Sequence, residues 1–319
     1  MELQTTIPLQ KADNAIDYQS KLVLLGSCFV ENMGERIHYY QFQHLQNPFG
    51  ILFQPLALEN LVHRALNGQP YQVHEVFEQK GIWHCFDAHS EIRSESQQGL
   101  LQQLNKALDE TRDWLESASH IIITLGTAWA YEQKATNALV ANCHKVPQKE
   151  FSKKLLSADM VQASLESIVK MVKTANPKAQ IIFTISPVRH LKDGFVENQQ
   201  SKANLITAVH GLLSSRAQSG DPSYFPSYEI MMDELRDYRF YGKDMVHPST
   251  LAVDYIWEKF ASIWISEYCR DVMEEVDGVR KGLQHRPFNP ETEAHQVFKK
   301  SLQAKITYLQ ERYPFMKFE

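Results

Sequence analysis

The chain has 319 residues, of which 43% are hydrophobic and 22% charged, close to the usage of folded globular proteins. Its formal net charge of -5, with no block of Lys and Arg, argues against nucleic acid as a partner. The N-terminus lacks the basic start and apolar stretch of a signal peptide, and no apolar run approaches the length of a membrane span. We therefore expect a cytoplasmic protein with no membrane partner.

Three apolar runs are predicted strands, and they are, in chain order, Leu22–Leu25, Ile121–Leu125 and Ile181–Ile185. Each run is continuous rather than alternating, which is typical of a parallel sheet with both faces covered by helices. Each ends in turn residues, which are Gly26-Ser27, Gly126-Thr127 and Ser186-Pro187.

Helical patterns alternate with these strands. Apolar-face residues precede the second strand at Leu101, Leu104, Leu108, Thr111 and Leu115, and the third at Leu156, Met160, Leu165, Ile168 and Val172. This alternation predicts an α/β fold with a doubly wound parallel sheet. A further helix is expected over Ser249–Ile265, and an apolar stripe of Phe298, Leu302, Ile306 and Leu309 predicts a helical tail. We expect one α/β domain over residues 1–265 and a helical extension over 266–319 packed on it.

Two insertions in this pattern are predicted β-hairpins. Tyr71–Phe77 and Ile82–Phe86 alternate around Gln79-Lys80-Gly81. Ala128–Gln133 and Ala138–His144 flank a second polar turn. Both insertions follow features of the expected ligand-binding edge, so they are candidates for its walls.

Ligands of doubly wound sheets bind outside the carboxyl ends of the strands. Ser27, the Gly126-Thr127 turn and the segment Ser186-Pro187-Val188-Arg189-His190 are therefore expected along one edge.

A late Asp-Met-Val-His-Pro segment supplies the partners that a reactive serine needs. A serine hydroxyl becomes nucleophilic when a histidine removes its proton, and a carboxylate orients that histidine. Asp244 and His247 are three residues apart, a spacing that puts both on one side of a turn. The alternative is a surface loop that only precedes the next helix.

Gly26-Ser27-Cys28-Phe29-Val30 resembles the signature of the GSCFA-domain family, with Val30 in place of Ala. Further matching segments are Asn47-Pro48-Phe49-Gly50, Ala141 to Pro147, Ser186 to His190, Asp193-Gly194, Ser201-Lys202 and Asp244 to Pro248. The resemblance covers roughly residues 20–260. It implies membership of the SGNH/GDSL-like hydrolase superfamily, with a flavodoxin-like, three-layer α/β/α fold and no cofactor.

The resemblance also implies roles for individual residues. Ser27 matches the nucleophile, and Asp244 and His247 match the Asp-x-x-His block. The backbone N–H groups of Ser27 and Gly50 would form the oxyanion hole. The third block, Gly-x-Asn-Asp, is altered, because Ala128 stands where the asparagine is expected.

Asn142 is our candidate for the missing oxyanion donor, and Asn47 is the second choice. For both residues the alternative is a purely structural hydrogen bond. The remaining candidates for substrate binding are Gly126, Thr127, His144, Arg189 and His190. His144 is more typical of a structural histidine than of a substrate contact. Arg189 and His190 are equally typical of a braced loop and of a site for an anionic or sugar group.

The sequence thus predicts a serine esterase that deacylates a small or carbohydrate ester. Three alternatives remain open: an acyltransferase to a sugar hydroxyl, a thiol nucleophile at Cys28, and a binding module without turnover. No metal site is expected, because the four cysteines lack metal-ligand spacing and the pairs His84-Cys85 and Cys143-His144 each offer one ligand easily.

Overall fold

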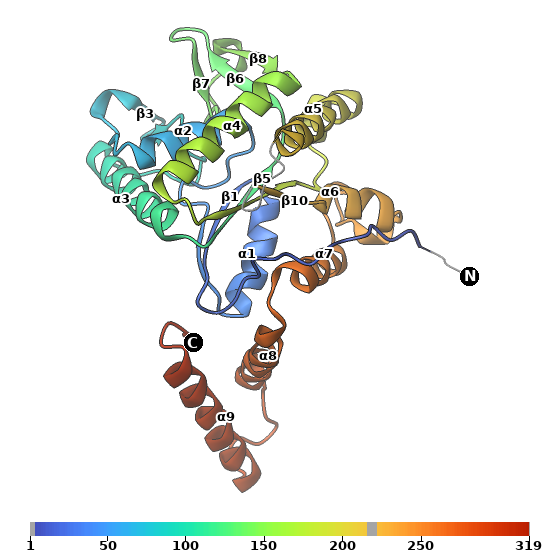
Figure 1. Cartoon of the computed structure of the whole chain (residues 1–319). Helices are drawn as coiled ribbons and strands as arrows, with labels where there is room; N and C mark the ends of the chain where they lie inside the picture. Colours follow the sequence, from blue (N-terminus) through green and yellow to red (C-terminus); the bar gives the residue numbers. More distant parts are fainter. Residues whose placement is uncertain (1–3, 216–221, 319) are drawn as a thin grey trace.

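The computed structural model describes residues 4–215 and 222–318. Its centre is a parallel sheet in the order β2-β1-β5-β9-β10 (Figure 1). The strands are β1 (Lys21–Gly26), β2 (Gln43–Gln46), β5 (His120–Leu125), β9 (Gln180–Ile185) and β10 (Ser223–Phe225). The three predicted strands are confirmed as neighbours. The edge strands β2 and β10 were not predicted, because β2 is mostly polar and β10 has three residues.

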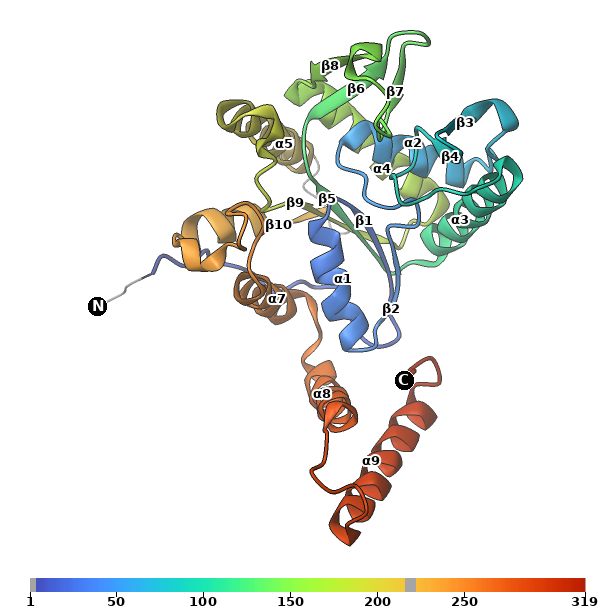
Figure 2. The ribbon, with the colours of Figure 1, turned by 180° about the vertical axis from the view of Figure 1, so that it is seen from behind.

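Helices cover both faces of the central sheet (Figures 1 and 2). Alternate residues of the strands pack on opposite helix layers. Val23 and Ile121 face a layer built mainly from α2 (Pro55–Leu66), α3 (Gln97–Ser117), α4 (Ala158–Ala175) and α5 (Phe195–Ser214). Leu22 and Ile122 face α1 (Phe29–Tyr39) and α7 (Thr250–Trp264). The expected three-layer α/β/α fold is therefore confirmed, and α7 begins where predicted because Ser249 caps it.

Two small sheets flank the central one. One is the hairpin of β3 (Val76–Gln79) and β4 (Ile82–Cys85), and the other combines β6 (Trp129–Gln133), β7 (Ala138–Val140) and β8 (Phe151–Leu155). Both predicted hairpins form. The first strand of the first hairpin starts at Val76, not Tyr71, because a 3₁₀ turn occupies Val73–Glu75. The return strand β7 ends at Val140, so Asn142 and His144 lie in the turn beyond it, contrary to our expectation.

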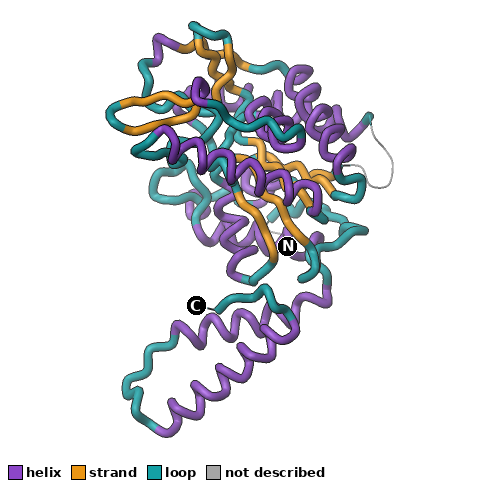
Figure 3. The backbone as a smooth tube through the Cα atoms, turned by 90° about the vertical axis from the view of Figure 1, so that its left-hand side faces the viewer, coloured by secondary structure: helices purple, strands orange, loops and turns teal. Residues whose placement is uncertain are grey.

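The C-terminal helices α8 (Arg270–Gln284) and α9 (Glu293–Arg312) form an antiparallel pair that extends from the body (Figures 1 and 3). Val272 and Val276 of α8 join the apolar cluster of α1 and α7. Within the predicted stripe, Ile306 and Leu309 are buried while Phe298 is 38% exposed. Among the residues that the structure describes, no helix has the length and apolarity to cross a membrane.

Shorter elements connect these layers. They are the helical turn α6 (Ser227–Glu229), the π-helical turn Ile230–Glu234, and 3₁₀ turns at Gln148–Glu150, Leu191–Asp193, Tyr238–Phe240 and Glu267–Cys269.

The turn after β1 brings two strands unusually close. Gly26 has φ +132°, and a Cβ atom there would lie 2.1 Å from the carbonyl oxygen of Thr124 in β5. Only glycine adopts this conformation without strain and leaves space for the neighbouring strand. The Gly26 N–H donates to Oδ1 of Asn47 at 2.9 Å. The geometry of the Gly26-Ser27 turn therefore depends on the absence of a side chain at position 26.

Replacement of this glycine should be costly. Gly26→Ala adds backbone strain and a clash with Thr124, and we expect it to lower the free energy of unfolding by about 2–5 kcal/mol in a urea titration.

Gly278→Ala is the matched control. Gly278 is an exposed glycine in α8, and a Cβ atom added to it would have no neighbouring atom within 4 Å. Alanine there should stabilise the protein by about 0.5–1 kcal/mol, because it is the better helix former. Equal effects of the two substitutions would contradict this explanation of the turn.

Candidate active site

Ser27 lies in the turn between β1 and α1, at the carboxyl end of β1. It is 0% exposed, and its hydroxyl has no hydrogen-bond partner among the described residues. The Ser27 N–H donates to the carbonyl of Thr124 at 3.0 Å. A buried hydroxyl without a partner is unusual, because desolvation without a hydrogen bond costs free energy.

Asp244 and His247 form the expected pair in the loop before α7. Nδ1 of His247 lies 2.7 Å from Oδ2 of Asp244, and the other carboxylate oxygen accepts the N–H groups of His247 and Val246 at 3.0 Å each. The backbone N–H of His247, followed by its imidazole, lowers the pKa of Asp244. The carboxylate is thus held ionised and orients the imidazole, with Nε2 left for another partner.

The structure does not join this pair to the serine. The Ser27 hydroxyl makes no hydrogen bond with His247 within the described ranges. Ser27 is fully buried, whereas the side chains of His247 and Asp244 are 52% and 54% exposed. The loop is tied in place by a hydrogen bond from Gly242 N–H to the carbonyl of His247 at 2.7 Å. The three residues lie at one edge of the sheet without forming a continuous relay.

The expected oxyanion donors are occupied. The N–H of Ser27 is bonded to Thr124, and the N–H of Gly50 donates to the carbonyl of Asn47 at 2.7 Å. Asn142 uses its side-chain oxygen to accept the His144 N–H at 2.8 Å, which closes a turn. In this conformation the backbone N–H groups of Ser27 and Gly50 are not free to bind an oxyanion.

Asn47 instead braces the Ser27 turn. Its side-chain oxygen accepts the Gly26 N–H, and its side-chain nitrogen donates to Glu31 at 2.6 Å. The structural alternative that the sequence left open for Asn47 therefore describes its contacts.

Four of the predicted substrate-binding residues line one cavity of about 470 Å³. Thr127, Asn142, His144 and His190 share it with Phe53, Gln54, Trp129, Tyr131, Val140, Ala141, Cys143, Lys145, Val146, Gln148, Lys192 and Asp193. Aromatic rings and polar side chains both contribute to its wall. The cavity lies at the carboxyl edge, since Thr127 follows β5 and His190 follows β9.

The two histidines of this cavity are neutral for the same reason. Burial lowers the pKa of His144 to about 4 and that of His190 to about 3, and the charges of Lys202 and His247 lower the latter further. His144 Nε2 is 2.6 Å from the carbonyl oxygen of Cys85, which is the contact of a structural histidine. His190 Nε2 is buried without a partner among the described residues, and its ring packs edge-on against Phe53.

Arg189 and Gly126 have mainly structural contacts. The Arg189 Nε donates to Oδ1 of Asn198 at 2.8 Å, and the Arg189 side chain lines a second cavity, of about 360 Å³, with Met245. Gly126 packs against Ser27, because a Cβ on Gly126 would lie 3.0 Å from the Cβ of Ser27.

The thiol of Cys28 is poorly suited to be a nucleophile. Burial raises its pKa, although Lys202 acts in the opposite direction. Among the described residues, no group of three or more His, Cys, Asp or Glu side chains is arranged to hold a metal ion.

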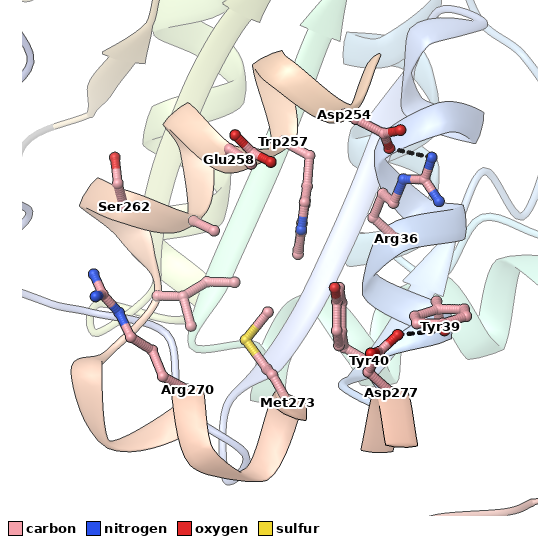
Figure 4. Close-up of a pocket in the computed structure, with 12 residues that line it drawn as sticks. Arg36, Tyr39, Tyr40, Asp254, Trp257, Glu258, Ser262, Arg270, Met273 and Asp277 are labelled. Atoms are coloured by element: carbon pink, nitrogen blue, oxygen red, sulfur yellow. Dashed lines mark hydrogen bonds and ion pairs between the residues drawn. The ribbon is translucent and has the colours of Figure 1, made fainter. Parts of the chain in front are cut away.

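A larger cavity of about 570 Å³ lies elsewhere, between α1, α7 and α8 (Figure 4). It is lined by the last turn of α1, and therefore lies toward the amino ends of the strands, away from Ser27. Arg36 pairs with Asp254, and the Tyr39 hydroxyl donates to Asp277 at 2.7 Å (Figure 4). These four side chains are paired with one another, although Nε of Arg36 has no partner among the described residues.

Sequence reasoning gave no role to Lys202, although the Ser201-Lys202 string matched the family. The spacing of residues along α5 nevertheless contained a signal that Lys202 is buried. Asn198, Ser201, Lys202 and Leu205 lie on the buried face of α5, so the spacing predicts burial of a lysine.

Taken together, the three-layer fold, the buried serine after β1 and the Asp-His pair before α7 define an α/β protein with a candidate nucleophile site. The chain belongs to the GSCFA family, whose model matches residues 21–260. A second model, the C-terminal domain of GSCFA domain proteins, matches residues 276–319.

Three solved structures are similar in part. A carbohydrate esterase family 3 protein from Talaromyces cellulolyticus aligns at 11% identity and a TM-score of 0.37, covering 81% of this chain and 99% of the other. An acetyl xylan esterase from Butyrivibrio proteoclasticus aligns at 11% identity and a TM-score of 0.40, covering 82% of this chain and 66% of the other. An acetyl esterase mutant with an acetate ion aligns at 11% identity and a TM-score of 0.37, covering 81% of this chain and 99% of the other. No curated protein matches the chain.

Loss of the Asn47 brace should weaken the turn. Asn47→Ala leaves the Gly26 N–H without its acceptor and removes one of two donors to the Glu31 carboxylate, and we expect a loss of about 1–3 kcal/mol in unfolding free energy. Asn67→Ala removes an exposed hydrogen bond at the end of α2 and should change stability by less than about 0.5 kcal/mol in the same urea assay. A result in which both variants unfold like the wild type would rule out the bracing role.

Proposed function

We propose that the protein is a serine hydrolase of the SGNH/GDSL type that removes an acyl group from a small or carbohydrate ester. The observation that carries the proposal is the buried, unpartnered hydroxyl of Ser27 at the carboxyl end of β1. An Asp244-oriented imidazole at the same edge supplies the base. The nearby cavity of about 470 Å³ has room for a substrate.

In the proposed reaction, His247 Nε2 takes the proton of Ser27 Oγ as the oxygen attacks the ester carbonyl. The π electrons of the ester carbonyl move onto the carbonyl oxygen as the new bond forms. When these electrons return, the alkoxide leaves and takes the proton from His247. Water then attacks the acyl-serine and passes its proton to His247. The carboxylic acid leaves, and Ser27 recovers its hydrogen.

This reaction requires His247 to approach Ser27. Catalytic hydrogen bonds are often long in the absence of substrate and shorten in its complex. The loop has a feature compatible with rearrangement, because Met245, between the two residues of the pair, has φ +58°. Bound substrate would stabilise the closed arrangement by contacts made only there.

A second candidate is acyl transfer to a sugar hydroxyl. It is favoured by the complete burial of Ser27, since exclusion of water protects an acyl-serine from hydrolysis. Acyl donor incubated with and without glycans distinguishes the two reactions, because a transferase releases little free acid without an acceptor.

The nucleophile is tested with a fluorophosphonate probe. Its phosphorus bonds to Ser27 Oγ, fluoride leaves, and His247 takes the hydroxyl proton. We expect one adduct by intact mass, located on Ser27 by peptide mapping and absent from Ser27→Ala.

Cys28→Ala is the matched control and should label at the wild-type rate. An adduct that persists in Ser27→Ala, or is lost in Cys28→Ala, would contradict the assignment. An unlabelled wild type that binds esters tightly would support a binding module instead.

The role of Asp244 gives a second prediction. Asp244→Asn removes the charge that orients His247, and labelling should slow by roughly 10²–10⁴-fold. Asp254→Asn, which breaks an ion pair with Arg36 at the other edge, should leave the rate unchanged. Similar rates in both variants would remove Asp244 from the mechanism.

A further inference from the structure

Lys202 is a fully buried lysine beside the Ser27 turn. Its Nζ donates to the carbonyl of Gly126 at 2.8 Å and to that of Ser186 at 2.7 Å, which are the residues directly after β5 and β9. No ion pair with a carboxylate holds Lys202 in the described part of the chain. A buried charge without a counter-ion is expensive, which makes this lysine a candidate for a functional role.

The residue before it holds the same turn. Ser201 Oγ accepts the N–H of Ala128 at 2.7 Å and lies 3.0 Å from the hydroxyl of Thr127. Two consecutive residues of α5 therefore fix the Gly126-Thr127-Ala128 turn. Because Gly126 packs against Ser27, this turn places Lys202 just behind the nucleophile.

Four backbone N–H groups around Ser27 are already committed. The N–H groups of Gly126 and Thr127 both donate to the carbonyl of Phe53, at 2.9 and 3.0 Å. Those of Ser27 and Gly50 are bonded to Thr124 and Asn47. These four groups therefore cannot stabilise negative charge that develops on a substrate oxygen at Ser27, and a nearby cation would add the positive potential that they do not supply. In a water-excluded interior a fixed cation supplies it effectively.

We propose that protonated Lys202 is a positioning residue that stabilises the negative charge developing at Ser27 during acyl transfer, acting through the Gly126 turn. This role rests on the proposed function of Ser27. Lys202 does not bond to the Ser27 hydroxyl, and its effect is the potential it creates together with the turn geometry that it fixes.

The protonation of Lys202 changes near neutral pH. Burial, together with the charge of Arg189, lowers its pKa to about 7, while Cys28 and Glu229 act in the opposite direction. The other groups that face it are the neutral His190 and the ring of Tyr228, whose centroid is 5.5 Å from Nζ. The stabilising charge is present below this pKa and is lost as the pH rises through it.

The test compares fluorophosphonate labelling of wild type and Lys202→Met at about pH 6 and about pH 9, on either side of this transition. At the lower pH, Lys202→Met should label at least about tenfold more slowly, whereas at the higher pH the two rates should converge. A merely structural lysine would slow the variant equally at both pH values. Lys202→Arg, which keeps its charge, should label like wild type at the lower pH and faster than wild type at the higher pH, where Lys202 itself is neutral.

Lys259→Met is the matched control. Lys259, on α7, forms an ion pair with Glu234 at 3.1 Å. Its replacement should leave the labelling rates at both pH values unchanged. Urea unfolding shows whether each variant is folded and whether Lys202 titrates. Wild type should gain stability between the two pH values, because the unfolded chain binds the proton that the folded chain releases, and Lys202→Met should gain less.

The outcomes separate the two proposals. A labelled wild type with a pH-independent ratio to Lys202→Met overturns the role of Lys202 and leaves Ser27 as the nucleophile. An unlabelled wild type overturns the function proposed for Ser27, and the role of Lys202 with it. A ratio that falls toward unity at the higher pH, with rescue by Lys202→Arg, supports both.

Discussion

The close approach of β1 and β5 at Gly26 is the constraint on which the candidate site depends. A left-handed glycine lets the chain turn against Thr124, and the Ser27 N–H then bonds to that strand. Asn47 holds the turn from the β2 side. The adjacent Gly126 completes this close packing. The serine is consequently placed by backbone geometry of three neighbouring strands, a rigid support of the kind that catalysis requires.

The same packing has a chemical consequence. It buries the serine hydroxyl and gives the N–H groups of Ser27 and Gly50 internal acceptors, so these two predicted oxyanion donors are not available in this conformation. The proposed base, His247, lies on an exposed loop before α7, where its imidazole is already paired with the carboxylate of Asp244. The proposed reaction therefore requires substrate to bring the imidazole of His247 to the serine. The lysine on α5 adds a buried cation to this site, and its pKa is lowered to about 7.

Sequence patterns predicted the parts of the fold in which periodicity is strong. The strands at Leu22–Leu25, Ile121–Leu125 and Ile181–Ile185 are continuous apolar runs, and their pairing follows from the α/β alternation. Edge strands carry weaker signals, because one face of β2 is polar and β8 has the sequence Phe-Ser-Lys-Lys-Leu. The Asp244–His247 contact was predicted because its geometry is local, with a spacing of three residues.

Other features of the site depend on the exact geometry of turns or on contacts between residues far apart in the chain. The occupation of the Gly50 N–H by Asn47 and the end of β7 before Asn142 are set by local turns that spacing does not determine. The hydrogen bonds from Lys202 to the carbonyl groups of Gly126 and Ser186 join residues that are 76 and 16 positions apart in the chain. Spacing along α5 predicts that Lys202 is buried, but only the assembled sheet edge shows what it binds.

The proposed catalytic unit of Ser27, His247 and Asp244 is tested most directly by a crystal structure of the protein after reaction with a fluorophosphonate. We expect phosphorus bonded to Ser27 Oγ, His247 Nε2 within hydrogen-bond distance of the adduct, and the Asp244 contact retained. An adduct on another residue, or a Ser27 adduct with His247 still pointing into solvent, would contradict the central claim that these three residues act together.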